Sequence, residues 1–393
     1  MLKTGDMDTV YFDHAATTPV DERVLEAMIP YFTEHYGNAN SPHGLGNNAK
    51  VAVEEARENI AEMIGAEPAE IVFTSGGTES DNCVIKGVVN ATGKTEVITS
   101  PLEHHAVLHT AEALKRHGAK PVYLEPNSKG IITAEKVEEA INDNTAMVSL
   151  MHVNNEIGSI NPLAEISEVC SKHNIPFHSD TVQSVGKIPV DVDELGLDFL
   201  SISGHKIYGP KGIGVMYMRH ATPWLPWMHG GSQERRRRGG TLNVPGIIGL
   251  AKAMELTQKE MDDHRKHFIK LRKRLINGLD KTFGDRYQIN GDTENGVPHI
   301  INISFLDPNG DGLDGEMLLL NLDVEGICCS NGSACTSGAM EPSHVLEGIG
   351  LDEKTANSSL RVSLGKQNTA EEIDYFVNKL KEVVERMMGT VKA

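Results

Sequence analysis

A lysine at the end of an apolar run is the residue of this chain best placed to react. The run at 198–202 is typical of a buried strand, and Ser203, Gly204, His205 and Lys206 follow it directly. This order puts a hydroxyl, an imidazole and an amine at the end of a strand, where open α/β sheets bind their ligands. Most loop lysines are solvated surface groups. The prediction of chemistry at Lys206 therefore depends on the residues that join it.

A carboxylate follows another predicted strand, upstream of Lys206. Asp180 comes just after the apolar run at 175–178, and Gln183 lies three positions further on. A buried carboxylate needs a cationic or donor partner. The ring nitrogen of pyridoxal phosphate (PLP) would be such a partner, because PLP sites combine a covalently linked lysine with an acidic group at that nitrogen. The alternative role of Asp180 is a helix N-cap.

Two turns offer groups that suit a phosphate. Gly77 and Thr78 lie between the predicted strand at 71–74 and a predicted helix, so their amides and the Thr78 hydroxyl could bind a phosphate at a helix N-terminus. The turn matches neither the dinucleotide nor the nucleoside triphosphate fingerprint, and a plain capped turn is the alternative. Further donors are available from Ser203 and His205, and from Thr241 after two glycines.

Two more polar residues follow predicted strands. His104 comes after the run at 96–99, where an imidazole could lie over a planar ring and exchange protons near neutral pH. The alternative is that His104 or His105 caps the following helix. Asn155 follows the run at 146–150 in the same way and could hydrogen-bond a ring substituent.

The spacing of the cysteines favours a thiol that takes part in a reaction over one with a structural role. The five are scattered without a C-x-x-C pair, which argues against a disulfide framework and a structural zinc site and favours a reducing compartment. Cys335 lies among Gly, Ser, Ala and Thr, as in exposed loops. Such a loop suits a thiol that reaches a substrate and carries a product away.

Cys328 and Cys329 end a strand-like run at 324–327 and are expected to pack as small apolar residues. Metal binding by these three is the alternative, but their spacing matches no common ligand pattern.

The elements that must position these groups alternate regularly between about Asp21 and Met218. Helix-length segments separate short apolar runs, which predicts βα units and a mostly parallel sheet. Asp21 is expected to cap a helix that reaches Tyr31. The predicted strands lie at 71–74, 96–99, 121–124, 146–150, 175–178, 199–202 and 213–217.

The rest of the chain predicts a second, smaller α/β unit. A long helical pattern covers 246–279, and two strand-like runs at 300–305 and 360–364 precede a closing helix at 370–387. We therefore predict a large domain of residues 17–262 with a sheet of about seven strands. Residues 1–16 and 263–393 would form the small domain that carries the Cys335 segment.

Composition limits the class of protein. The chain has 393 residues, of which 39% are hydrophobic and 23% charged, as in ordinary globular proteins. A formal net charge of -18 argues against general nucleic-acid or anionic-membrane binding, and Arg235–Arg238 is the local exception. The start of the chain has no apolar core of a signal peptide, and no window approaches the length of a membrane span. We expect a cytoplasmic protein.

Taken together, these motifs resemble a known family. The likeness runs from YFDHAATTP at 11–19 to RVSLG at 361–365, and its most specific parts are TSGGTESDN, HSDTVQSVGK, SGHK and GSACTS, in the family's order. The chain resembles the PLP-dependent cysteine desulfurases of the NifS/IscS group, in the fold-type I, class V aminotransferase superfamily. The Ser/Gly-rich segment around Cys335 is similar to that branch rather than to the selenocysteine lyase-like branch.

The resemblance implies a role for each candidate residue. Lys206 would bind PLP covalently, and Cys335 would form a persulfide. Arg361 would hold the substrate carboxylate, a bidentate task that suits a guanidinium. The remaining implied roles are Asp180 as partner of the ring nitrogen, Gln183 as donor to the ring hydroxyl, His104 as stacking residue and acid/base, Thr78, Ser203 and His205 as phosphate ligands, Thr241 as a phosphate ligand of the second subunit, Gly77 as a further cofactor contact, and Asn155 as a contact of cofactor and substrate.

The implied reaction converts L-cysteine to L-alanine in a homodimer. The sulfur would pass from Cys335 to an iron–sulfur scaffold protein or another acceptor. We predict no resident metal, although Cys335 could transiently ligate an iron–sulfur cluster. The alternatives are a selenocysteine lyase or another class V PLP enzyme and, from another class, a non-enzymatic sulfur-relay scaffold. The unbroken run Arg235–Arg238 departs from the family pattern, which leaves the roles of these arginines open.

Overall fold

A seven-stranded sheet lies at the centre of the large unit in the computed structural model, which describes residues 9–306, 312–332 and 342–388. The strand order is β2-β8-β7-β6-β5-β3-β4; β8 runs antiparallel to both of its neighbours, and the other neighbouring pairs are parallel. The predicted mostly parallel sheet is confirmed, and each predicted strand lies within two residues of an observed one. The strands are β2 (Ile71–Thr74), β3 (Glu96–Thr99), β4 (Lys120–Tyr123), β5 (Thr145–Ser149), β6 (Phe177–Asp180), β7 (Phe199–Ser203) and β8 (Gly214–Met218).

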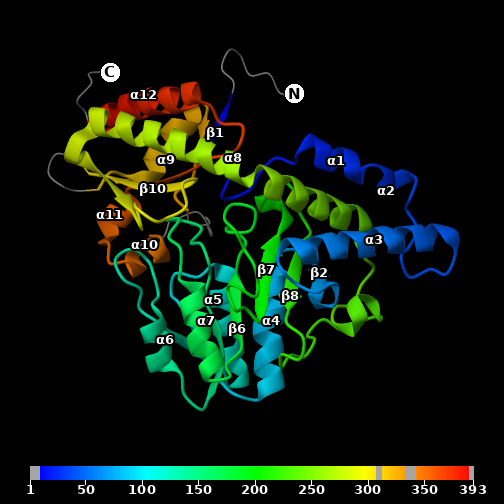
Figure 1. Ribbon diagram of the computed structural model, residues 1–393. Coiled ribbons are helices and arrows are strands. Elements are labelled where there is room, and N and C mark those ends of the chain that lie inside the picture. Colours follow the sequence, from blue (N-terminus) through cyan, green and yellow to red (C-terminus); the bar gives the residue numbers. More distant parts are fainter. Residues whose placement is uncertain (1–8, 307–311, 333–341, 389–393) are drawn as a thin grey trace.

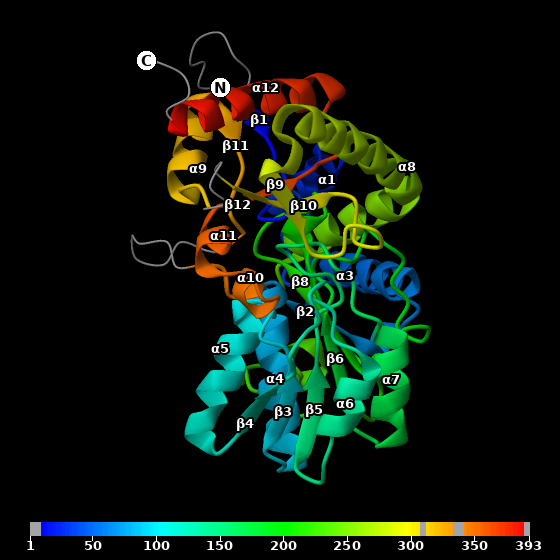
Figure 2. The ribbon, with the colours of Figure 1, turned by 90° about the vertical axis from the view of Figure 1, so that its left-hand side faces the viewer.

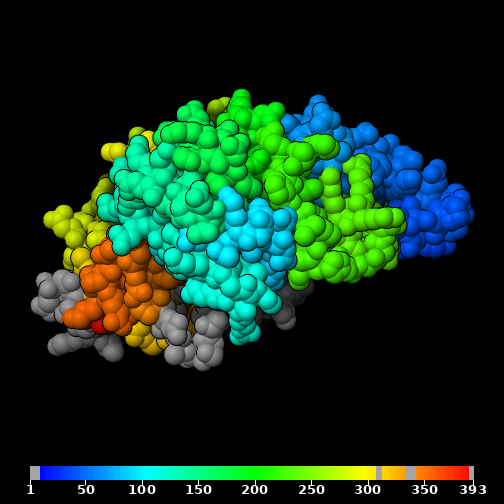
Figure 3. Space-filling view, turned by 90° about the horizontal axis from the view of Figure 1, so that it is seen from below, coloured from blue at the N-terminus to red at the C-terminus, as the bar shows by residue number. Residues whose placement is uncertain are grey.

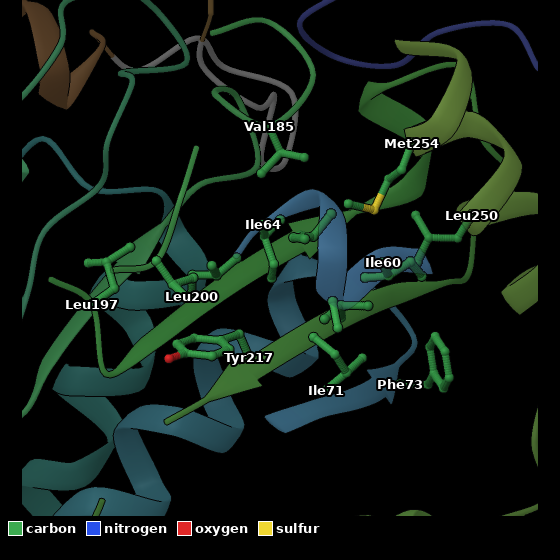
Figure 4. Packing of buried hydrophobic residues seen from close by; sticks show 14 of the residues in the cluster. Ile60, Ile64, Ile71, Phe73, Val185, Leu197, Leu200, Tyr217, Leu250 and Met254 are labelled. Atoms are coloured by element: carbon green, nitrogen blue, oxygen red, sulfur yellow. The ribbon is translucent and has the colours of Figure 1, made fainter. Parts of the chain in front are cut away.

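Helices bury both faces of this sheet, which explains why its strands are nearly continuous apolar runs. Within β8, Val215 and Tyr217 join the core under α3 and α8, whereas Met216 and Met218 join the core under α4 and α5. Figure 4 shows Ile60 of α3 on the Tyr217 side of the sheet. The helices of this unit are α1 (Glu22–Met28), α2 (Pro30–Thr33), α3 (Gly44–Met63), α4 (Gly77–Thr92), α5 (His105–Leu114), α6 (Ala134–Ala140), α7 (Leu163–Lys172) and α8 (Val244–Phe283).

A smaller unit lies over one end of the sheet (Figures 1 and 2). It contains the antiparallel sheet β12-β10-β9 and the parallel pair β1-β11. Helix α8 serves both units, because Leu250 packs in the large core and Leu275 in the small one. The domain boundaries near residues 16 and 262 stay predictions. The elements of this unit are β1 (Val10–Tyr11), β9 (Tyr287–Asn290), β10 (Ile300–Phe305), α9 (Gly315–Val324), β11 (Ile327–Cys328), α10 (His344–Gly348), α11 (Glu353–Asn357), β12 (Ser359–Ser363) and α12 (Ala370–Met387).

Two expected elements differ from the observed ones. Asp21 does cap a helix, but α1 ends at Met28, and Pro30 starts the separate helix α2 because proline has no N–H with which to continue a helix. The prediction of a strand at 324–327 was wrong for most of this stretch. Val324 is the last residue of α9 and is 84% exposed, and a strand begins only at Ile327. Gly326, with a φ of 77°, makes the turn between them.

Candidate active site

A cavity of about 420 Å³ opens at the carboxyl edge of the large sheet, where the small unit covers it. Cys335 lies outside the described residues, and Thr241 is exposed and does not line this cavity. The structure thus brings most of the predicted site together, while the role of each residue stays a prediction. The ten predicted residues that line the cavity are Gly77, Thr78, His104, Asn155, Asp180, Gln183, Ser203, His205, Lys206 and Arg361.

Lys206 follows the end of β7 in a single turn of 3-10 helix, with its amine directed at the N-terminal segment. Its Nζ donates to the carbonyl oxygens of Ala15 and Ala16 at 2.6 and 2.8 Å. Burial, and then the charge of Arg361, lower the pKa of this amine to about 8. Gln183 donates to the same Ala15 carbonyl at 2.9 Å. Lys206 therefore loses its proton much more readily than a surface lysine, as a nucleophile or base requires.

Two carboxylates lie at the base of the cavity. The Asp180 Oδ1 accepts from the Val182 amide at 2.9 Å, and Asp81 of α4 lies 3.5 Å from the Nε2 of His178. Burial raises the pKa of both carboxyls, and their mutual repulsion raises that of Asp81 further. A cationic group in the cavity would relieve this cost, as a protonated ring nitrogen does. Sequence reasoning missed Asp81, although it lies one helical turn after Gly77 on α4.

His104 has the capping role that was its alternative, and it also lines the cavity. Its Nδ1 accepts from the Ala106 amide at 3.1 Å, so it is the N-cap of α5. This hydrogen bond leaves the proton of the neutral ring on Nε2. Burial lowers the pKa of His104, with Asp180 acting in the opposite direction. A neutral ring that can exchange a proton at Nε2 thus borders the cavity.

The first turn of α4 forms an end of the cavity that could bind an anion. Its N-cap is Gly76, without a side-chain hydrogen bond, so the first amides of this 16-residue helix remain available. A side chain at Gly77 would come within 2.8 Å of Val182, so the backbone lies close to the cavity floor. His205 lies 3.1 Å from the Thr17 hydroxyl, and burial lowers the pKa of its imidazole to about 4. With the hydroxyls of Thr78 and Ser203, this end fits a phosphate.

Arg361 of β12 faces the cavity from the small unit. One of its nitrogens bonds the Asp13 carboxylate at 2.8 Å, and another donates to the Asn155 carbonyl at 2.9 Å. Its Nε and the Asn155 side-chain oxygen are buried without a partner in the described part of the chain. An unused guanidinium donor suits a carboxylate ligand. Asp13 was missed as a site residue, although it belongs to the YFDHAATTP motif.

The segment before Thr241 is fixed to the large unit by a buried ion pair. Glu234 bonds Arg57 of α3 at 2.7 Å and accepts from the Phe73 amide at 2.8 Å. Arg238 bonds Glu79, in the first turn of α4, at 2.8 Å. Within the arginine run, Arg238 therefore links this segment to the first turn of α4.

Comparisons with known proteins find a matching family model, similar relatives and similar solved structures. The model of the aminotransferase class-V family matches residues 10–376. A cysteine desulfurase IscS of Dictyoglomus turgidum is 46% identical over 380 residues, which cover 96% of this chain and 95% of the relative. A solved NifS-like protein is 41% identical, with a TM-score of 0.89 over 96% of this chain and all of the other. A solved structure of SspA in complex with cysteine is 38% identical, with a TM-score of 0.80 over 91% of this chain and 99% of the other.

Proposed function

Since the chain belongs to the aminotransferase class-V family and, within it, to the NifS/IscS group of cysteine desulfurases, we propose that it converts L-cysteine to L-alanine. The released sulfur would be held as a persulfide on Cys335. The observation that carries this proposal is the convergence of ten predicted residues on one cavity. The family prediction made from four sequence motifs is confirmed.

The cofactor we propose is PLP. Its support is a cavity lined by the buried carboxylates of Asp81 and Asp180, by Gly77 and Thr78 of the uncapped first turn of α4, and by Lys206. The two carboxylates match a cationic ring nitrogen. The first turn of α4 matches a phosphate, and Lys206 matches an aldehyde. When bound, PLP supplies an electron sink that stabilises negative charge at the substrate Cα.

Three residues of the chain would then each carry out one part of the reaction. Arg361 holds the substrate carboxylate, for which its Nε has no other partner among the described residues, and Lys206, with its lowered pKa, takes the proton from Cα. The Cys335 thiolate bonds to the substrate sulfur as the carbon–sulfur bond breaks. The bonding pair stays with the substrate carbon, which takes up a proton and becomes the methyl group of alanine, and Lys206 returns a proton to Cα. The products are alanine and one persulfide.

This function is tested with the purified chain, PLP and L-cysteine. We expect a near-visible absorbance band of the bound cofactor and the release of one alanine per persulfide formed. A reductant that clears the persulfide should sustain further turnover. A chain that develops no such band with added PLP, and releases no alanine from L-cysteine, would contradict the proposal.

We also propose a homodimer, in which Thr241 completes the partner's phosphate site. Large exposed apolar side chains gather on α1 and α2, including Ile29 and Phe32 at 51% and 60% exposure. With α3 they project at one end of the molecule (Figures 1 and 3). Such a face is typical of an interface between protein chains. Phe32→Glu should yield monomers in analytical ultracentrifugation.

The acceptor and the compartment are proposals as well. Among the described residues, none of the helices combines the length and the apolar composition needed to cross a membrane. We propose a cytoplasmic enzyme that passes sulfur to an iron–sulfur scaffold protein or a similar acceptor. Following labelled sulfur from the persulfide to added candidate acceptors would identify the acceptor.

A further inference from the structure

One buried carboxylate touches both described ends of the segment that contains Cys335. Glu156 is 2% exposed, and Ser343 donates to its Oε2 at 2.5 Å. On the other side, a side chain at Gly332 would come within 2.8 Å of the same oxygen, so the backbone there lies directly against the carboxyl. Glu156 therefore joins residue 332 to residue 343, across the chain that carries the thiol.

One end lies close to the proposed substrate-binding group Arg361, and the other packs on the large unit. Ser330 pairs with Arg361 through a β-bridge, and its hydroxyl donates to Asp13, the carboxylate that bonds Arg361. After Ser343, helix α10 packs on the large unit, with Leu346 in one apolar cluster with Leu102. Figures 2 and 3 show α10 lying against the large unit near α5. The base of the segment thus has neighbours in both units.

Glu156 lies on a turn that the large unit fixes firmly. The side chain of Asn154 accepts from the Glu156 amide at 2.9 Å and donates to the Leu102 carbonyl at 3.0 Å. Between them, Asn155 offers its carbonyl to Arg361. Burial raises the pKa of the Glu156 carboxyl. A neutral amide of the same shape should therefore fit in its place.

We propose that Glu156 is a positioning residue that fixes the base of the Cys335 segment relative to Arg361. It acts through Ser343 and Gly332, the described residues on either side of that segment, and so sets where the segment starts and ends relative to the substrate carboxylate that Arg361 holds. The inference rests on the proposed desulfurase function and adds a residue that controls the sulfur-transfer step. Losing it should slow that step while substrate and cofactor still bind.

Glu156→Ala and Glu156→Gln test this inference in the PLP-loaded enzyme. Single-turnover formation of the Cys335 persulfide should slow about 10- to 100-fold in Glu156→Ala, because small misplacements of reacting groups have effects of this size. The cofactor band and its response to L-cysteine should stay within about twofold of wild type. Glu156→Gln can still accept from Ser343 and should form the persulfide nearly as fast as wild type.

Ser343→Ala removes the other partner of the same hydrogen bond, the hydroxyl that donates to Glu156. It should slow persulfide formation, and the double variant with Glu156→Ala should be no slower than Glu156→Ala alone, because the two residues act as a unit. Ser343 also caps α10. Asp352→Ala, which removes the cap of α11 in the same unit, is the matched control and should keep the wild-type rate.

The outcomes separate this inference from the function on which it rests. Wild-type persulfide rates in Glu156→Ala would overturn the role of Glu156. If Glu156→Ala does not fold, a wild-type rate in Ser343→Ala would overturn it instead. A wild-type enzyme that forms no persulfide from L-cysteine would overturn the desulfurase proposal itself.

Discussion

The two walls of the cavity are built in different ways. On the sheet side, Asp180 and Lys206 come from the ends of neighbouring buried strands, so the framework of the large unit fixes them locally. On the opposite side, Arg361 depends on Asp13 and Asn155, which lie hundreds of residues away in the chain. The strands of the large unit therefore place the backbone of the sheet wall, although the Lys206 amine also bonds Ala15 and Ala16 of the N-terminal segment. The other wall exists only when the two units meet.

The two walls therefore have different proposed functions. The sheet wall holds the groups that suit PLP, and the opposite wall holds those that suit the substrate carboxylate and the base of the Cys335 segment. Changes to the first wall should remove the cofactor or its chemistry. Changes to the second should leave the cofactor in place and alter substrate affinity or sulfur transfer.

The largest effect is expected at Lys206. Lys206→Ala removes both the covalent link to PLP and the proposed base, so kcat for alanine formation should fall by at least about 10³-fold. The near-visible band of the bound cofactor should be lost as well, which absorbance spectra will show. A variant that keeps both the band and alanine formation would break the assignment of the sheet wall to the cofactor.

A smaller effect, of a different kind, is expected at Arg361. Arg361→Gln should raise the KM for L-cysteine about 100-fold, because losing one partner of a buried charged contact removes several kcal/mol of binding. The cofactor band should persist. Asp13→Asn, which leaves an oxygen that can still accept from Arg361, should change KM by no more than about tenfold. Loss of the band in Arg361→Gln would show that the two walls are not separable.

The large unit should also lose stability in acid, because it buries a histidine between two residues of the cavity lining. His152 follows β5 and is 5% exposed, and burial lowers its pKa to about 4. Between that value and about 6.5, the unfolded chain binds a proton that the folded chain does not, so stability falls as pH falls. Between pH 7 and 5, wild type should lose about 2 kcal/mol more unfolding free energy than His152→Gln. Equal losses in equilibrium unfolding would contradict the lowered pKa.

The sequence predicted the sheet wall better than the opposite wall for a physical reason. Most residues of the sheet wall end or follow a strand, and strands leave a local pattern of apolar residues. Asp81, which lies inside α4, is the exception that was missed. The contacts of Asp13 with Arg361 and of Glu156 with Ser343 join residues 348 and 187 positions apart, and no local pattern records them. The error at Val324 has a similar cause, because only the packing of Leu318 and Leu322 shows that this stretch ends a helix.

The most direct test of the central claim follows labelled sulfur from L-cysteine onto the chain. In wild type, mass spectrometry of the proteolysed enzyme should find the label as one extra sulfur on the peptide that contains Cys335. Cys335→Ser should keep the cofactor band, carry no label and release no alanine. Label on Cys328 or Cys329, or undiminished sulfide release by Cys335→Ser, would contradict the account.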